Sequence, residues 1–228
     1  MARLRKSQKR WVRSSTESDI GRVLVKCEPP VFTLDPARIF DRDAPLEIEI
    51  GAGKGDFILS RAAAYPKRNL LAIELSSAVV RLLAVRVAHS DSDNVRVLQA
   101  DARSIVNLLL PDRSVSAFHI YFPDPWPKDR HAKHRLFSPF FVTNLVRTLR
   151  PGGVLYVATD VRDYADRIFA MLDSHGFIRR SESALGDLNS NFGKKFAAEG
   201  RPLSSACFVL SDRIDQSLDP SPFAGPIL

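Results

Sequence analysis

Cysteine, long apolar runs and leader-like segments are scarce in this chain of 228 residues. The two cysteines, Cys27 and Cys207, lie far apart and form no Cys-x-x-Cys pair, which indicates neither a zinc site nor a disulfide framework and suits a reducing compartment. No apolar run approaches the roughly 20 residues that a membrane span needs. The charged N-terminus is not followed by the apolar stretch of a secretory signal. We therefore expect a cytoplasmic protein without a membrane anchor.

Acidic residues are outnumbered, because 33 Lys and Arg face 26 Asp and Glu, for a net charge of +7. This excess favours a polyanionic partner, since each neutralised phosphate releases a counterion, although it can also serve solubility alone. Acid is absent from residues 1–13, which carry six Lys and Arg. Such a run repels itself. We expect it to be a flexible arm on an RNA backbone, with Trp11 available to stack on a base; a solvated tail without a role is the alternative.

Apolar, strand-like runs alternate with helix-like stretches from about residue 44 onward. Such alternation predicts an α/β fold with a mostly parallel sheet and helices on both faces. We expect one catalytic domain over 44–210, a basic arm and lead-in over 1–43 and a C-terminal tail over 211–228. The predicted strands are 46–50, 70–75, 94–99, 115–122, 154–159, 177–180 and 206–210, and the predicted helices are 56–65, 77–89, 105–109, 139–149 and 161–175.

A glycine loop follows the first predicted strand and opens the first helix. Its glycines, Gly51, Gly53 and Gly55, let the backbone approach a ligand closely, and ligands of open α/β sheets bind at this edge. The spacing Gly-x-Gly-x-Gly differs from the dinucleotide fingerprint Gly-x-Gly-x-x-Gly. Glu49, just before the loop, is poorly suited to an anionic pyrophosphate. It suits a ligand with a cationic amino group, such as S-adenosylmethionine, which bears an ammonium and a sulfonium.

Two further acids end the next two predicted strands. Glu74 can accept both hydroxyls of a ribose, which S-adenosylmethionine and NAD share. Asp101, followed by Ala102, can accept a hydrogen bond from an adenine amino group. Each acid alone could be a surface charge or a helix cap. Acids at successive strand ends favour a cofactor site formed by these residues and the glycine loop.

A proline-rich loop, FPDPWPKDRHAKHR (122–135), follows the fourth predicted strand. Its prolines stiffen the backbone around Asp124 and Trp126. The ring can stack on a base, and the carboxylate can accept hydrogen bonds from the amino edge of guanine. The loop also has four basic residues whose expected partners are phosphates, namely Lys128, Arg130, Lys133 and Arg135. No third ligand with recognisable spacing joins the two histidines of the loop, so we expect no metal.

With these segments the chain resembles the bacterial tRNA (guanine-N7-)-methyltransferases. The resemblance rests on EIGAGKG (49–55), AIEL (72–75), QADAR (99–103), the proline-rich loop and LRPGGVLYVATD (149–160), of which the proline-rich loop is the most specific. It implies a Rossmann-like, seven-stranded class I methyltransferase fold, S-adenosylmethionine as methyl donor and a variable-loop guanine of tRNA as substrate. It further implies that Glu49, Glu74, Asp101 and Asp124 surround the donor, that Asp124 is the catalytic position, and that Lys128 and Asp160 contact the substrate.

The family also has a late motif, T-x-[FY]-E, about ten residues before a Gly-Arg pair. Counting back from Gly200-Arg201 places Ser190 and Gly193 at its ends, so both are predicted at substrate-binding positions. Ser190 keeps a hydroxyl, whereas Gly193 stands where the family has a carboxylate. This departure leaves open an RNA-binding protein of methyltransferase fold with reduced or lost turnover.

Other functions fit the sequence less well. A methyltransferase for another RNA, a small molecule or a protein would share the donor site, but the basic arm and loop speak against the last two. An NAD-dependent oxidoreductase is disfavoured by the glycine spacing and by Glu49. We expect a monomer, for which the sequence gives no contrary signal.

Overall fold

The structure is a computed structural model that describes residues 20–25, 33–127, 129–181 and 203–210. In these ranges the chain forms an eight-stranded sheet in the order β1-β4-β3-β2-β5-β6-β8-β7. The strands from β1 to β6 run parallel to their neighbours, while β8 is antiparallel to β6 and β7. Their bounds are β1 (Leu24–Val25), β2 (Leu46–Ile50), β3 (Asn69–Glu74), β4 (Val95–Gln99), β5 (Val115–Tyr121), β6 (Leu149–Thr159), β7 (Phe177–Ser181) and β8 (Ser204–Leu210).

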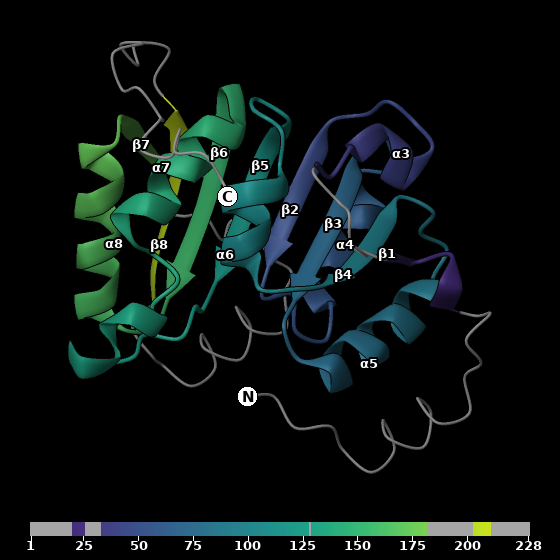
Figure 1. Cartoon of the computed structure of the whole chain (residues 1–228), viewed down its shortest axis with the longest axis horizontal. Coiled ribbons are helices and arrows are strands. Elements are labelled where there is room, and N and C mark those ends of the chain that lie inside the picture. The colour runs from purple at the N-terminus through teal and green to yellow at the C-terminus, as the bar shows by residue number, and fades with distance from the viewer. Residues whose placement is uncertain (1–19, 26–32, 128, 182–202, 211–228) are drawn as a thin grey trace, which may run out of the picture.

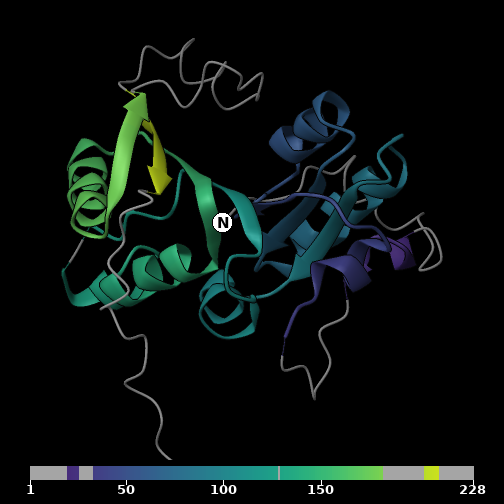
Figure 2. The same ribbon diagram turned by 90° about the horizontal axis from the view of Figure 1, so that it is seen from above.

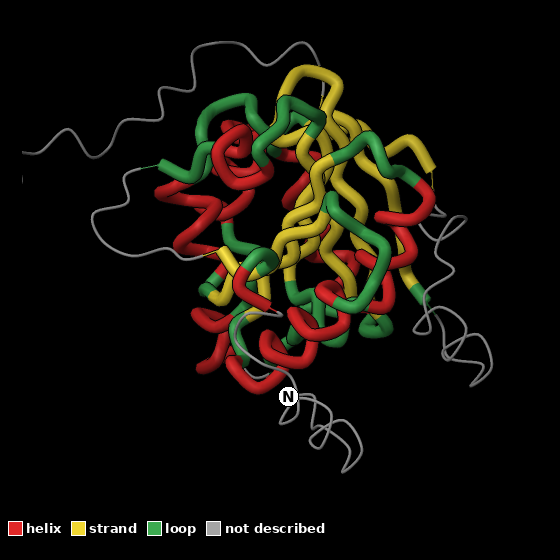
Figure 3. Tube along the Cα trace, turned by 90° about the vertical axis from the view of Figure 1, so that its right-hand side faces the viewer, coloured by secondary structure: helices red, strands yellow, loops and turns green. Residues whose placement is uncertain are grey.

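Helices cover both faces of this sheet (Figures 1 and 2). Seen from the side, the strands form a central layer between them (Figure 3). The predicted fold class, a mostly parallel α/β sheet, is therefore confirmed. The described sheet has eight strands where the resemblance implied seven, because the short β1 pairs with β4 at its edge. The helices are α3 (Pro36–Phe40), α4 (Asp56–Ala64), α5 (Ser77–Ala88), α6 (Ala102–Ser104), α7 (Pro139–Thr148) and α8 (Arg162–Ser174), with a π-helical turn η1 (Ile105–Leu109) and a 3₁₀ helix η2 (Asp129–His134).

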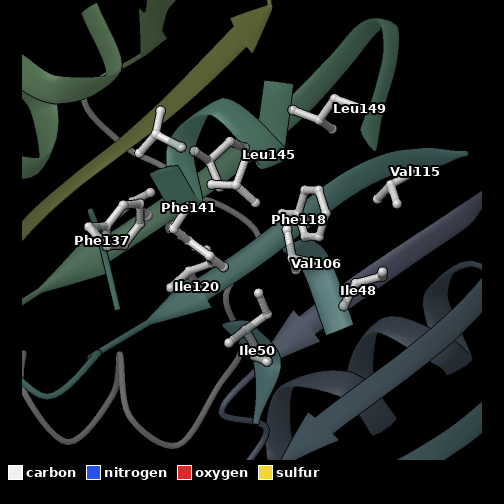
Figure 4. Close-up of a cluster of buried hydrophobic side chains, with 14 of the residues drawn as sticks. Ile48, Ile50, Val106, Val115, Phe118, Ile120, Phe137, Phe141, Leu145 and Leu149 are labelled. Carbon is white, nitrogen blue, oxygen red and sulfur yellow. The ribbon is translucent and has the colours of Figure 1, made fainter. Parts of the chain in front are cut away.

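Two apolar cores lie on opposite faces of the sheet, because successive strand residues point to opposite sides. In β3, Leu71 and Ile73 belong to one core, whereas Leu70 and Ala72 belong to the other. The first core is packed by η1, α7 and α8 and includes the fully buried Phe118 (Figure 4). The second is packed by α4 and α5. Both faces of the sheet are thus covered by packed apolar side chains, which support the loops at its carboxyl edge.

Local signals in the sequence explain several element boundaries. The Ser138 hydroxyl accepts a hydrogen bond from the Phe141 N–H at 3.2 Å, and Pro139 occupies the first turn of α7. Gly176, which follows the C-cap residue His175 of α8, has φ +81°, in the left-handed region that favours glycine. These caps confirm the predicted start of α7 and end of α8.

The segment before the predicted strand 154–159 differs from a simple turn. β6 begins at Leu149, which pairs with Val115, whereas Val154 pairs with Ala117. Four residues, 150–153, therefore face a single residue of β5 and bulge out of the ladder, with Gly152 at φ +70°. The sequence also gave no prediction of β1, α3, α6 or η2, which are too short for a periodic pattern to be visible.

Candidate active site

A cavity of about 740 Å³ lies beyond the carboxyl ends of β2, β3, β4 and β5. This is the edge at which open α/β sheets bind ligands. Its walls come from the segments that follow these four strands, and His134 and Leu136 complete it. The predicted residues Glu49, Gly51, Gly53, Glu74, Asp101, Ala102 and Asp124 all line this cavity. The structure therefore brings together side chains that lie up to 75 residues apart in the sequence.

The three glycines of the loop have two different roles. All have positive φ, and at Gly51 and Gly53 an added Cβ would meet open space or, at 3.9 Å, only the Gly51 carbonyl. At Gly55 an added Cβ would overlap the side chain of Leu83 on α5. Gly55 is buried and does not line the cavity. Gly51 and Gly53 leave room for a ligand, whereas Gly55 allows α4 to pack against α5.

Glu49 is the buried acid of the cavity wall. Glu49 is only 6% exposed, and its Oε2 atom has no hydrogen-bond partner. Burial, together with the negative charges of Asp56 and Glu74, raises the pKa of the Glu49 carboxyl well above its usual range. An unpaired buried carboxylate is costly unless a cation reaches it. This cavity therefore fits a ligand that carries positive charge next to the glycine loop.

Glu74 joins the glycine loop to the turn after β3. Its Oε2 accepts a hydrogen bond from the Gly53 N–H at 3.0 Å, and its Oε1 accepts from Leu75 N–H at 2.9 Å and Ser76 N–H at 3.0 Å. Each carboxylate oxygen can accept about two hydrogen bonds. The Glu74 carboxylate is thus oriented by backbone donors, and its Oε2 retains capacity for one further donor, such as a ribose hydroxyl.

Asp101 is held by Arg103, a residue for which the sequence analysis predicted no role. Asp101 Oδ1 accepts from the Arg103 N–H at 2.9 Å, and Oδ2 lies 2.7 Å from Arg103 Nη2. The Arg103 guanidinium lowers the pKa of the Asp101 carboxyl, which keeps it charged. The arginine fixes the carboxylate at the position where the sequence predicts an adenine amino group.

The proline-rich loop, which follows β5, has a strained backbone at two residues. Phe122 has φ +52° and Trp126 has φ +41°, values that side chains rarely adopt. Arg135 stabilises this shape, because its guanidinium donates to the carbonyl oxygens of Pro125 at 3.2 Å and Trp126 at 3.0 Å. The exposed Asp124 lies between these points on the cavity wall.

Aromatic rings gather at the mouth of the cavity beside Asp124. The Trp126 ring lies 5.0 Å from His134 and 5.7 Å from His131, measured between centroids. Trp126 and His134 both line the cavity. The resulting surface is suited to stacking on a planar base.

A buried polar network lies beneath the cavity, and the sequence analysis predicted none of it. Glu47 is completely buried and accepts hydrogen bonds from Arg61 at 2.8 and 3.0 Å, Arg68 at 2.6 Å and His119 Nε2 at 2.9 Å. Burial alone would raise the pKa of Glu47, but the bonds from His119 and Arg61 outweigh it and hold this pKa at about 2. Two glutamates in LEIEI, a strand predicted to be buried, were the signal that could have revealed it.

This network determines where the hydroxyl proton of Tyr121 points. Because Glu47 is ionised and can only accept, His119 Nε2 must carry the hydrogen, and burial lowers the pKa of His119 so that the ring is neutral. His119 Nδ1 is then an acceptor, 3.0 Å from the hydroxyl of Tyr121, which donates to it. Tyr121 also lines the cavity. Because its hydroxyl donates to His119, the same proton is not available to Glu49.

The remaining predicted site residues lie elsewhere. Arg135 braces the proline-rich loop, and Arg130, which is exposed on η2, does not line the cavity. Asp160 follows β6 and also lies outside the cavity wall. Lys128, Ser190 and Gly193 fall outside the described residues, as do the arm 1–13 and the tail 211–228.

Neither a metal cluster nor a membrane-spanning helix is found in the part of the chain that the structure describes. No group of three or more His, Cys, Asp and Glu side chains there is arranged to hold a metal ion. No described helix is both long and apolar enough to cross a bilayer.

Solved structures share this architecture. The 16S rRNA methyltransferase KamB superposes with a TM-score of 0.60 at 17% identity, over 83% of this chain and 99% of that one. A SAM-dependent methyltransferase from Aquifex aeolicus gives a TM-score of 0.51 at 14% identity, over 87% and 100% of the two chains. At such low identity the likeness concerns the fold alone. The fold is that of a class I S-adenosylmethionine-dependent methyltransferase.

Sequence comparison narrows this class to one family. Residues 43–203 match the family model described as "Putative methyltransferase". The tRNA (guanine-N(7)-)-methyltransferase of Nitrosococcus oceani is 40% identical over 82% of this chain and 78% of its own length. The enzyme of the same name from Bordetella pertussis is 41% identical over 65% of this chain and 58% of its own length. The chain belongs to the tRNA (guanine-N7-)-methyltransferase family.

Proposed function

We propose that this enzyme transfers a methyl group from S-adenosylmethionine to N7 of a guanine in tRNA, the variable-loop guanine. The observation that carries the donor site is the unpartnered Oε2 of Glu49, buried in the wall of a cavity beside two open glycines. The family supports the substrate, and its known members at about 40% identity bear the name of this reaction. We also propose that the enzyme acts as a monomer in the cytoplasm, where its tRNA substrate is found.

The residues of the cavity divide between the two reactants. Glu49 binds the ammonium of the donor, Glu74 accepts from a ribose hydroxyl through Oε2, and Asp101 with Ala102 holds the adenine. Gly51 and Gly53 give the donor backbone contact. The donor supplies an activated methyl group on a sulfonium, so the carbon–sulfur bond breaks as the bond to N7 forms. Guanine N7 has a free lone pair, and no proton has to leave before attack.

Asp124 acts on the substrate side. It lies between two prolines in a loop that Arg135 braces, so its carboxylate is positioned before the substrate arrives. The methylated guanine is cationic, and a fixed carboxylate stabilises the charge that develops on it. Trp126 and His134 supply ring surfaces on which the base stacks. Catalysis is then mainly alignment of N7 with the methyl carbon.

Basic side chains hold the tRNA backbone. The loop composition predicted phosphate contacts for Lys128 and Arg130. The family resemblance adds three further substrate contacts, at Asp160, Ser190 and Gly193. The exposure of Arg130 on η2, beside the aromatic mouth, supports this assignment. Arg135 contributes through the loop that it holds, because its guanidinium already bonds two carbonyl oxygens.

The proposed function is tested by incubating the full chain with unmodified tRNA and S-adenosylmethionine and mapping N7-methylguanine along the RNA. Asp124→Asn keeps the shape of the side chain and removes its charge. We expect it to lower kcat about 10²- to 10³-fold, the usual effect of losing one preorganised stabilising group.

Asp112→Asn is the matched control, because Asp112 pairs with Arg147 away from the cavity. Its rate should equal that of the wild type. Methylation at another guanine atom, or of a small molecule but not of tRNA, would contradict the proposed function. A wild-type rate for Asp124→Asn would contradict the role of Asp124 alone.

A further inference from the structure

Arg103 lies between the donor half and the RNA half of the active site. Its Nε and Nη2 atoms contact the Asp101 carboxylate at 3.2 and 2.7 Å, while its Nη1 donates to the carbonyl oxygen of Lys133 at 3.2 Å. Arg103 itself lines the cavity. One planar guanidinium therefore binds a cofactor-site acid and the backbone of η2 at the same time.

The η2 helix is connected directly to the substrate side of the cavity. It contains Arg130 and Lys133, both exposed, and His134, whose ring contacts Trp126. The next residue after η2, Arg135, bonds the Trp126 carbonyl. A change in the position of η2 therefore reaches the basic side chains and the aromatic mouth together.

Solvent access sets the strength of the contact between Arg103 and Asp101. Their side chains are 41% and 35% exposed, so water screens the pair when the cavity is open. A ligand that covers Asp101 removes part of this water, and an ion pair strengthens as its surroundings become less polar. A stronger pair holds the guanidinium in the orientation from which Nη1 reaches Lys133.

We propose that Arg103 is a positioning residue that couples binding of the methyl donor to binding of RNA. Donor at Asp101 orders Arg103, Arg103 orders η2, and the basic and aromatic side chains of η2 meet the RNA in the right place. This inference rests on the proposed function, because it requires RNA as the second ligand. By linkage the coupling must be reciprocal, so RNA must tighten the donor by the same factor.

The test measures this coupling factor in the full-length protein. The dissociation constant of an unmodified tRNA transcript is measured with and without saturating S-adenosylhomocysteine, which fills the donor site without reaction. The ratio of the two constants is the coupling factor. Couplings between sites are typically about 5- to 150-fold, and we expect the lower end, about fivefold, for a single exposed arginine.

Three variants separate coupling from stability and from charge. Arg103→Gln removes the guanidinium and should bring the ratio close to one. Arg103→Lys keeps the charge but cannot bind Asp101 and Lys133 together, so it should also reduce the ratio. Arg38→Gln removes an equally positive side chain from α3, far from the cavity wall, and should leave the wild-type ratio.

A ratio of one in the wild type, or a wild-type ratio in both Arg103 variants, would overturn the inference. A rise in both dissociation constants of an Arg103 variant without a change in their ratio would show that Arg103 acts only through charge or stability, which also contradicts the inference. If the wild type binds donor but no tRNA, the proposed substrate is wrong and the coupling falls with it.

Discussion

At the scale of single residues, Glu49 has opposite effects on stability and on binding. In the ligand-free protein its carboxyl is buried, its Oε2 is unpartnered and its pKa is raised. A carboxyl whose pKa is raised by folding contributes its full stability below its unfolded pKa, and this contribution is lost as the pH rises through the folded pKa. As the pH rises through this raised pKa, ionising Glu49 therefore costs stability unless the donor is bound.

We expect Glu49→Gln to unfold at a higher temperature than the wild type in the absence of ligand, with a difference that grows as the pH rises. The same variant should bind S-adenosylmethionine more weakly, because the ammonium loses its charged partner. Thermal unfolding and calorimetry across pH measure both effects. A variant that is less stable than the wild type at high pH would contradict the cost assigned to this carboxylate.

Proton binding should also be visible in the donor affinity of the wild type. Since a proton and the cationic donor compete for Glu49, lowering the pH through its raised pKa should weaken S-adenosylmethionine binding. Glu49→Gln has no such proton to bind, so its affinity should vary less over the same range. Equal pH profiles for the two proteins would show that another group controls the titration.

At the scale of elements, the glycine loop can be separated into a binding part and a packing part. Gly55→Ala combines a left-handed backbone with overlap between the new Cβ and Leu83, so it should cost about 2 kcal/mol or more. Gly53→Ala meets almost open space and should cost about 1 kcal/mol, the backbone strain alone.

Donor affinity should show the reverse order, with the larger loss in Gly53→Ala, because its Cβ enters the cavity. Urea unfolding and donor titration of both variants test this. Equal stability losses for the two variants would mean that contact with α5 does not distinguish Gly55.

The Glu47 network ties α4 to β2 and β5 and should govern the response to acid. Folding lowers the pKa of the Glu47 carboxyl to about 2. The stability that this carboxylate contributes is therefore present above its unfolded pKa and is lost as the pH falls through about 2. Lowering a pKa from 4.5 to about 2 corresponds to about 3 kcal/mol.

Glu47→Gln should therefore destabilise the protein by about 3 kcal/mol at neutral pH, where it leaves Arg61 and the partly exposed Arg68 without their buried anion, and by less as the pH falls. Urea unfolding between pH 7 and pH 3 measures this. Asp112→Asn, at an exposed pair, is the control and should change stability by less than about 1 kcal/mol. A loss that stays constant with pH would contradict the role of the ionised carboxylate.

At the scale of the whole molecule, the excess of positive charge should make tRNA binding depend steeply on salt. The logarithm of the association constant should fall linearly with the logarithm of salt concentration. Arg130→Gln should reduce this slope by about 1, because one phosphate contact is lost, whereas Arg38→Gln should leave it unchanged. A flat response in the wild type would mean that the net charge of +7 serves only solubility.

The sequence predicted every strand of the described sheet except the two-residue β1, because most of them are apolar runs between turn signals. The carboxyl-edge acids Glu49, Glu74 and Asp101 could be placed from strand ends alone. It could not predict contacts that join distant segments. Glu47 meets Arg61, Arg68 and His119 only after β2, β5 and α4 have come together.

Two assignments by composition were incomplete for the same reason. Arg135 lies in a basic run that suggests phosphates, yet its guanidinium binds carbonyl oxygens of its own loop. Gly55 belongs to a ligand-binding pattern, yet Leu83, 28 residues further along the chain, explains the need for glycine there. Side-chain partners of this kind are set by tertiary packing and leave no local spacing.

The unpaired oxygen of Glu49 has a consequence for attempts to engineer this protein. Selection for heat resistance alone rewards any change that relieves a buried charge, and this position offers such relief to a single substitution. Libraries screened only for survival on heating should therefore accumulate substitutions of Glu49 that resist heat but have lost methyltransferase activity. A useful screen has to demand methylation in every round.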